Sequence, residues 1–226
     1  MKKLVLFISF ICITITSNAQ INEIGFIVGG SNYIGDIGSE YYINPNNFMG
    51  GIIYKWNVNP RMALRGTFTY SQISADDADA TNQGRQLRGL RFTNSVKELA
   101  AGLEYNYFDY NIDKYNQRQT PYLLVEIAAV NYNVVTAETT PKEYEYDSKI
   151  SLAIPFGIGY KTRIARDFAM AVEIRATYTF TDELDYNNYD IESLTFGNPN
   201  SNDWYTFVGL SFVYAFGRPP CYATPY

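Results

Sequence analysis

The chain has 226 residues, 46% of them hydrophobic, and it contains no histidine. The absence of imidazole excludes Ser-His-Asp hydrolysis and every other scheme in which histidine is the base, and the formal charge of -5 disfavours nucleic acid as a partner. This length suits one domain.

The first nineteen residues have the features of a secretory signal peptide. Lys2 and Lys3 precede an apolar run that is too short to span a bilayer as a helix, and Ser17-Asn18-Ala19 supplies the small residues of a cleavage site. We predict that residues 1–19 are removed, which leaves 16 basic and 23 acidic residues. Cys221 is then the one remaining cysteine, and an odd cysteine in an oxidising compartment is either free or bonded to another chain.

The rest of the chain contains segments in which apolar and polar residues alternate, the period of a β-strand with two unlike faces. In residues 168–181 the even positions from Phe168 to Phe180 are all apolar, whereas the odd positions are small, hydroxylic or charged. Eight segments have this period, although Ile27 makes the first ambiguous: residues 23–33, 51–57, 62–73, 97–108, 121–131, 150–161, 168–181 and 204–216.

Eight such strands predict an all-β fold, an eight-stranded antiparallel transmembrane β-barrel of the outer-membrane type, with its apolar face toward lipid. The shorter connections, residues 58–61, 109–120 and 162–167, are expected at the periplasmic end, and the longer ones, residues 34–50, 74–96, 132–149 and 182–203, outside the cell. The barrel would occupy residues 20–216 and a periplasmic tail residues 217–226. The alternative is a soluble lipocalin-type barrel with its apolar face inside. The small residues on the polar face, the outward aromatic residues near both rims and the signal peptide favour the membrane barrel.

The inward face of these strands carries four basic and four acidic residues. Because side chains nearly fill an eight-stranded barrel, we predict that these residues neutralise one another in a charge network in the lumen: Lys55, Arg65, Glu98, Glu104, Glu126, Lys161, Glu173 and Arg175. The alternative is a narrow ion path, which requires an open bore.

Acidic residues gather in two of the outer loops, at Asp76, Asp77 and Asp79 and again in residues 182–190. Carboxylates are ligands for calcium, but neither loop has a regular ligand spacing, so we interpret both as solvated acidic loops. We expect no catalytic residue, no cofactor and no metal site.

The tail of residues 217–226 follows the aromatic end of the last segment and contains three prolines and the single thiol. It is either a disordered stub or a docking peptide whose Cys221 bonds to a periplasmic partner. We hypothesise that partner docking involves the tail and the short turns through Cys221, Arg218, Tyr222, Tyr226, Asn59, Arg61 and Arg166.

Several stretches resemble a known family: GFIVGGSNYIGDIG at 25–38, YINPN at 42–46, NPRMALRGTFTY at 59–70, SADD at 74–77, IPFGIGYK at 154–161, TFTDELDY at 179–186 and NDWYTFVGLSFVYAF at 202–216. They are similar to the PorG-like (DUF6089) outer-membrane proteins of Bacteroidetes, a component of the type IX secretion system. The resemblance implies a non-enzymatic barrel that anchors a periplasmic ring, formed by a PorK-like lipoprotein and a PorN-like protein, to the outer membrane. In gliding relatives the ring proteins are GldK and GldN.

Two further functions are compatible with the same residues. One is a generic OmpA-type stabilising barrel or narrow pore, and the other is a surface adhesin that uses the long acidic loops. Ion conductance distinguishes the pore from the docking barrel, and removal of the tail distinguishes docking from adhesion.

Overall fold

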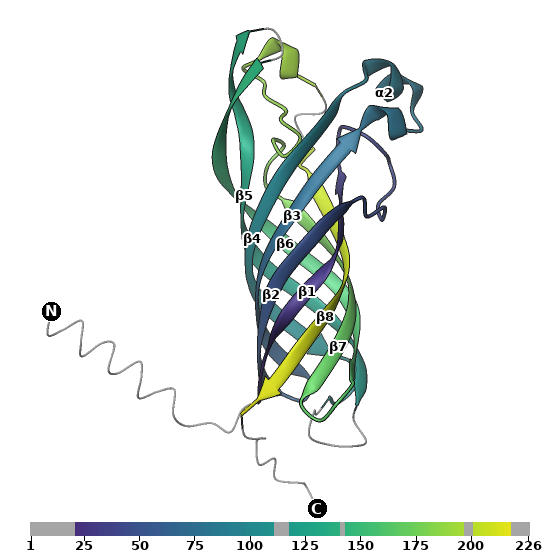
Figure 1. Ribbon diagram of the computed structural model, residues 1–226, viewed down its shortest axis with the longest axis vertical. Helices are drawn as coiled ribbons and strands as arrows, with labels where there is room; N and C mark the ends of the chain where they lie inside the picture. Colours follow the sequence, from purple (N-terminus) through teal and green to yellow (C-terminus); the bar gives the residue numbers. More distant parts are fainter. Residues whose placement is uncertain (1–20, 111–117, 141–142, 197–200, 218–226) are drawn as a thin grey trace, which may run out of the picture.

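The computed structural model describes residues 21–110, 118–140, 143–196 and 201–217 and shows a single barrel of eight strands (Figure 1). The strands are β1 (Ile21–Ile34), β2 (Asn47–Asn59), β3 (Met62–Asp76), β4 (Arg91–Asn106), β5 (Gln119–Thr140), β6 (Glu143–Arg163), β7 (Phe168–Thr179) and β8 (Trp204–Phe216). Three short helical segments lie between them: η1 (Asp77–Asp79), α2 (Gln83–Arg88) and η2 (Glu192–Leu194). In the described part of the chain, no helix has the length and apolar character that crossing a membrane requires.

Each strand pairs antiparallel with its neighbours in the sequence, and β1 pairs with β8 to close the barrel. Following paired residues once around the barrel from Val96 of β4 leads back to β4 at Asn106, ten residues further along. A stagger of this kind tilts the strands by about 35–45°, and Figure 1 shows the strands running obliquely around the barrel. The predicted all-β fold of eight antiparallel strands is confirmed.

Alternation along each strand separates an apolar exterior from a largely polar interior. On β1, for example, Ile24 is 52% exposed on the outside and Ile27 is fully buried inside. Ile27 is apolar although it points inward, because it belongs to an apolar cluster within the barrel. Ile27 packs there with Met49, Ile53 and Phe207. A closed barrel with an apolar outer face satisfies all backbone pairing within the sheet, which is the condition for crossing a bilayer with strands.

Aromatic side chains on the outer face form two groups at opposite ends of this apolar belt. Trp56, Tyr105 and Tyr160 lie toward the end with the short connections, and Phe68 and Tyr70 toward the other end. Such girdles form at the two interfaces of a membrane. The protein is therefore an integral outer-membrane barrel, and the end with the short connections is the one expected to face the periplasm.

The prediction of a long loop at residues 132–149 was wrong. β5 continues to Thr140 and β6 begins at Glu143, and the two strands stay paired here, with Tyr132 opposite Lys149 and Val135 opposite Tyr146. These residues extend beyond the part of the barrel that faces lipid, so neither face of the hairpin has to be apolar. Apolar and polar residues therefore do not alternate there, and the sequence does not show the period of a strand. The loops at 34–50 and 74–96 are shorter than predicted for the same reason, since β2 begins at Asn47 and β4 at Arg91.

Candidate functional site

All eight residues of the predicted charge network lie inside the barrel, and each is at most 2% exposed. They come from six strands, β2 to β7, and their side chains converge because they occupy inward positions of the alternation. The network has three connected centres, which are Glu104, Arg65 and Arg175.

Glu104 is the centre of the part nearer the periplasm. Its carboxylate lies 2.7 Å from Nζ of Lys55, 2.6 Å from Nζ of Lys161 and 3.5 Å from Nη1 of Arg65. Three cations around one carboxylate make this group essential for charge balance, because a buried charge without a partner is costly.

Arg65 links this part to the next. Its guanidinium donates to both carboxylate oxygens of Glu173, at 2.5 and 3.1 Å, in the bidentate geometry that favours arginine over lysine. Tyr122 donates to the same carboxylate at 2.7 Å, and Thr67 donates to Glu126 at 3.0 Å. Each of these acceptors is thus held in place by a neutral donor as well as by a cation.

Arg175 completes the network toward the extracellular end. Its guanidinium lies 3.0 Å from Glu98 and 3.4 Å from Glu126, and Tyr205 donates a hydrogen bond to Glu98. Paired and hydrogen-bonded charged side chains therefore occupy the part of the lumen that would have to hold water in a pore.

Some members of the interior were missing from the predicted network. Glu23 is 1% exposed and accepts a hydrogen bond from Asn57 at 2.9 Å, so the lumen has five carboxylates for its four cations. The sequence did contain the information for Glu23, because Glu23 and Ile27 lie on the same face of β1. Since Ile27 is apolar, alternation did not identify this face as the inward one. Tyr122 and Tyr205 act as donors to carboxylates of other strands, and alternation along a single strand does not predict such contacts across the barrel.

The predicted docking residues at the periplasmic end are only partly described. Arg218, Cys221, Tyr222 and Tyr226 lie outside the described residues, as does the predicted signal peptide. Asn59 organises the β2–β3 turn, where its side chain accepts from the backbone N–H of Arg61 at 2.8 Å and of Met62 at 2.9 Å.

Two arginines remain accessible at this end. The side chain of Arg61 is 52% exposed and lies 2.5 Å from Asp109, which joins the β2–β3 turn to the segment after β4. Arg166 is exposed in the turn between β6 and β7, and it forms no ion pair with the parts of the chain that the structure describes. Both side chains are accessible at this end, but the charge of Arg61 is balanced by Asp109, and Arg166 is the one that presents positive charge there.

At the other end, residues 180–196 and 201–203, which lie between β7 and β8, fold back into the mouth of the barrel. Leu184 is fully buried, and Asp185 and Asp203 are each 1% exposed. The hydroxyl of Tyr33 hydrogen-bonds to Asp203 and lies 2.9 Å from Asp185. A single hydroxyl proton cannot serve two acceptors, so this arrangement suits a carboxyl that keeps its own proton. Burial raises the pKa of Asp185 to about 7, and it also raises the pKa of Asp203.

The acidic residues of the neighbouring loop lie in different surroundings. Asp77 is fully buried and its carboxylate accepts a hydrogen bond from Nε of Arg88 at 2.8 Å, whereas Asp79 is exposed. Among the described residues, no group of three or more His, Cys, Asp or Glu side chains is placed to hold a metal ion.

Comparison with known families decides the relationship. The model of the family described as "Domain of unknown function (DUF6089)" matches residues 2–225. The chain belongs to this family. No curated protein matches the DUF6089 barrel.

Solved structures similar to the DUF6089 barrel are themselves outer-membrane proteins. Ail, the attachment invasion locus protein of Yersinia pestis, has 14% identity and a TM-score of 0.47 in its complex with the heparin analogue sucrose octasulfate, with 87% of this chain and 99% of that chain covered. Neisserial surface protein A has 10% identity and a TM-score of 0.46, with 86% and 97% covered. A major outer membrane protein from Thermus thermophilus has 11% identity and a TM-score of 0.47, with 87% and 99% covered.

Proposed function

We propose that this DUF6089 barrel is a non-enzymatic component of the type IX secretion system that anchors the periplasmic ring to the outer membrane. The ring partners would be a PorK-like lipoprotein and a PorN-like protein, or GldK-like and GldN-like proteins in gliding bacteria. The chain then acts by holding a membrane position and presenting its periplasmic end, without transporting or transforming a substrate.

The filled lumen is the observation that supports this proposal most strongly. Glu104 and its three cations, together with the two arginine-centred groups, occupy the space that a pore would leave open. An anchor needs a rigid barrel and a contact surface outside the membrane, and the accessible Arg61 and Arg166 lie on such a surface. The motifs from residues 25 to 216 that resemble PorG-like proteins point to the same partner.

The single thiol provides a direct test of the partner. The protein is purified from native membranes without reductant and run on gels with and without reductant, in parallel with Cys221→Ser. The proposal expects a larger, reductant-sensitive species that contains a ring lipoprotein and is absent from the variant. If only monomer is present in every lane, the covalent contact through Cys221 is refuted and docking would have to be noncovalent, through the turns.

A further inference from the structure

Two arms rise from the extracellular end of the barrel (Figure 1). A cleft lies between them. The helix arm consists of residues 76–93 with η1 and α2. The hairpin arm consists of residues 132–140 of β5 and 143–149 of β6 with the adjoining residues 185–196. The cleft between them has a volume of about 560 Å³, enough for more than one side chain of a ligand.

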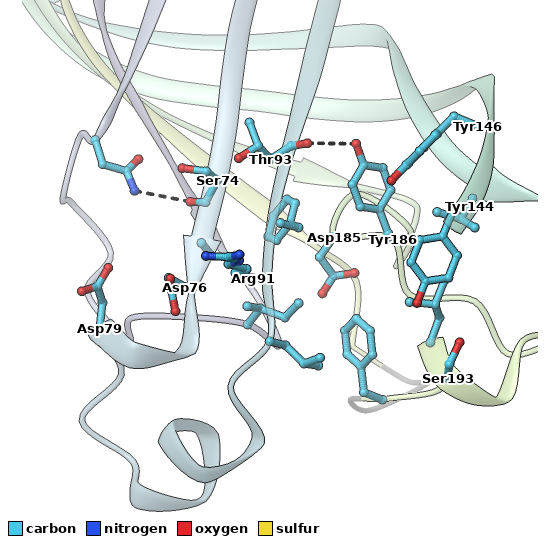
Figure 2. Close-up of a pocket in the computed structure, with 18 residues that line it drawn as sticks. Ser74, Asp76, Asp79, Arg91, Thr93, Tyr144, Tyr146, Asp185, Tyr186 and Ser193 are labelled. Carbon is cyan, nitrogen blue, oxygen red and sulfur yellow. Dashed lines mark hydrogen bonds between the residues drawn. The ribbon is translucent and has the colours of Figure 1, made fainter. Parts of the chain in front are cut away.

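The two sides of the cleft differ in chemistry (Figure 2). Tyr144, Tyr146 and Tyr186 present aromatic rings on the hairpin arm, whereas Asp76 and Asp79 present carboxylates on the helix arm. Aromatic faces and carboxylates both attract cations, the first through the ring quadrupole and the second through charge.

Tyr186 is held across the cleft in a strained conformation. Its φ of 69° lies in the left-handed region, and it is the one non-glycine residue with a positive φ in the described part of the chain. The hydroxyl of Tyr186 donates to the carbonyl oxygen of Thr93 at 2.9 Å, and its ring makes an edge contact with Tyr146 at 5.3 Å. A bulky side chain rarely adopts this backbone conformation, and such strain collects at ligand sites where surrounding contacts enforce it.

The charge of the surrounding segments favours a ligand with positive charge. The sequence segments that form the extracellular end, residues 35–46, 76–93, 133–149 and 180–203, contain fifteen acidic and five basic residues. Arg91 is the basic residue that lines the cleft, and it stands opposite Asp76 in the β3–β4 register. An excess of negative charge around a concave site concentrates cations there and repels anions.

We propose that this cleft binds a basic peptide segment, with a lysine or arginine side chain between the tyrosine rings and the carboxylates of Asp76 and Asp79. A bare metal ion does not fit the described geometry, because the carboxylates do not converge and the cleft is far larger than an ion. The partner would be a protein met at the cell surface. This interaction is separate from docking at the periplasmic end, so either can fail without the other.

The test uses the mature protein in lipid nanodiscs and two labelled octapeptides, one of alternating glycine and lysine and one of alternating glycine and glutamine. Binding is measured by fluorescence anisotropy at low and high salt. The proposal expects the lysine peptide to bind at least tenfold more tightly than the glutamine peptide, and its binding to weaken as salt rises. If the glutamine peptide binds equally well, or the lysine peptide does not bind at millimolar concentration, the proposal is overturned.

Matched variants locate the site. We expect Asp76→Asn with Asp79→Asn to weaken lysine-peptide binding about tenfold, and Tyr144→Ala with Tyr146→Ala to weaken it about fivefold. Asp190→Asn with Glu192→Gln removes the same charge at exposed positions that do not line the cleft, and it should change binding less than about twofold. Equal losses in the two charge variants would mean diffuse attraction and would overturn the assignment to the cleft. Each variant is first checked for the gel mobility of the folded barrel, and the comparison of two peptides on the unmodified chain does not depend on any variant.

Discussion

Glu104 has more cationic partners than any other carboxylate of the lumen, with Lys55, Lys161 and Arg65 around it. Alternation along the strands predicted eight of the nine charged residues of the described strands that point into the lumen, all except Glu23, because the period of two is a local property. It did not predict which residues would pair, because pairs such as Arg65 with Glu173 are set by the stagger of strands that lie far apart in the sequence.

Glu104→Gln should destabilise the barrel by about 3–5 kcal/mol, since it leaves a cluster of buried cations without their shared counter-charge. The free energy of unfolding is measured by urea titration in lipid vesicles. Glu183→Gln is the control, because Glu183 and its partner Lys149 are both more than one-third exposed, and such surface pairs contribute about 1 kcal/mol or less. Equal losses in the two variants would contradict the role assigned to Glu104.

Asp185 makes the closure of the extracellular mouth dependent on pH. Its pKa is raised to about 7, whereas an unfolded aspartate titrates near pH 4, so the folded loop binds more protons than the unfolded one between these values. Burial also raises the pKa of Asp203, which has the same sign of effect. We expect protection of residues 180–203 from protease to be greatest near pH 4 and to fall as the pH rises to about 7.

In Asp185→Asn this side chain no longer titrates, so its share of the pH dependence should disappear, whereas the share that comes from the buried Asp203 should remain. Stronger protection at pH 8 than at pH 5 in the unmodified chain would show that the sign is wrong.

At the scale of the elements, the helix arm depends on one buried side chain. Asp77 accepts from the backbone N–H of Gly38 and of Leu90, each at 3.0 Å, and from the guanidinium of Arg88 at 2.8 and 3.0 Å. Burial alone would raise the pKa of Asp77, but these donors outweigh it and hold the pKa below its usual range. The arm therefore stays folded at moderately acidic pH.

Asp77→Ala should open the helix arm locally without unfolding the barrel. The hydrogen bonds that it removes join Asp77 to Gly38, Arg88 and Leu90, which lie outside the strands of the barrel. Loss of charge-assisted hydrogen bonds worth about 3 kcal/mol in total would speed tryptic cleavage after Arg85 and Arg88 on the order of 100-fold. Asp79→Ala, at an exposed position of η1, should leave the cleavage rate nearly unchanged. An unaltered rate in Asp77→Ala would refute this role of Asp77.

The strand boundaries show where sequence reasoning succeeds and where it fails. β8 occupies the predicted residues 204–216, and the membrane-facing parts of the other strands were also found, because lipid on one side enforces alternation. The upper halves of β5 and β6 were missed since both of their faces lie outside the lipid. The cleft between the arms was not predictable either, because it depends on the φ of Tyr186 and on how the loops pack.

At the scale of the whole molecule, the lumen charges bear on the choice between an anchor and a pore. Side chains from all eight strands fill the barrel, and residues 180–196 and 201–203 cover its mouth. We expect no single-channel steps in planar bilayers at either low or high salt, and none after Arg175→Gln. Steps whose size changes in Arg175→Gln or Glu104→Gln would support the pore.

The most direct measurement is the amount of ring lipoprotein that copurifies with the barrel from native outer membranes. Four strains are compared: one with the full chain, one lacking residues 218–226, one with Arg61→Ala and Arg166→Ala, and one with residues 132–149 shortened at the opposite end. Docking at the periplasmic end predicts that ring protein and secretion fall in the second and third strains and persist in the fourth. Full copurification and secretion in the second and third strains would contradict the account and leave a barrel that only stabilises the membrane.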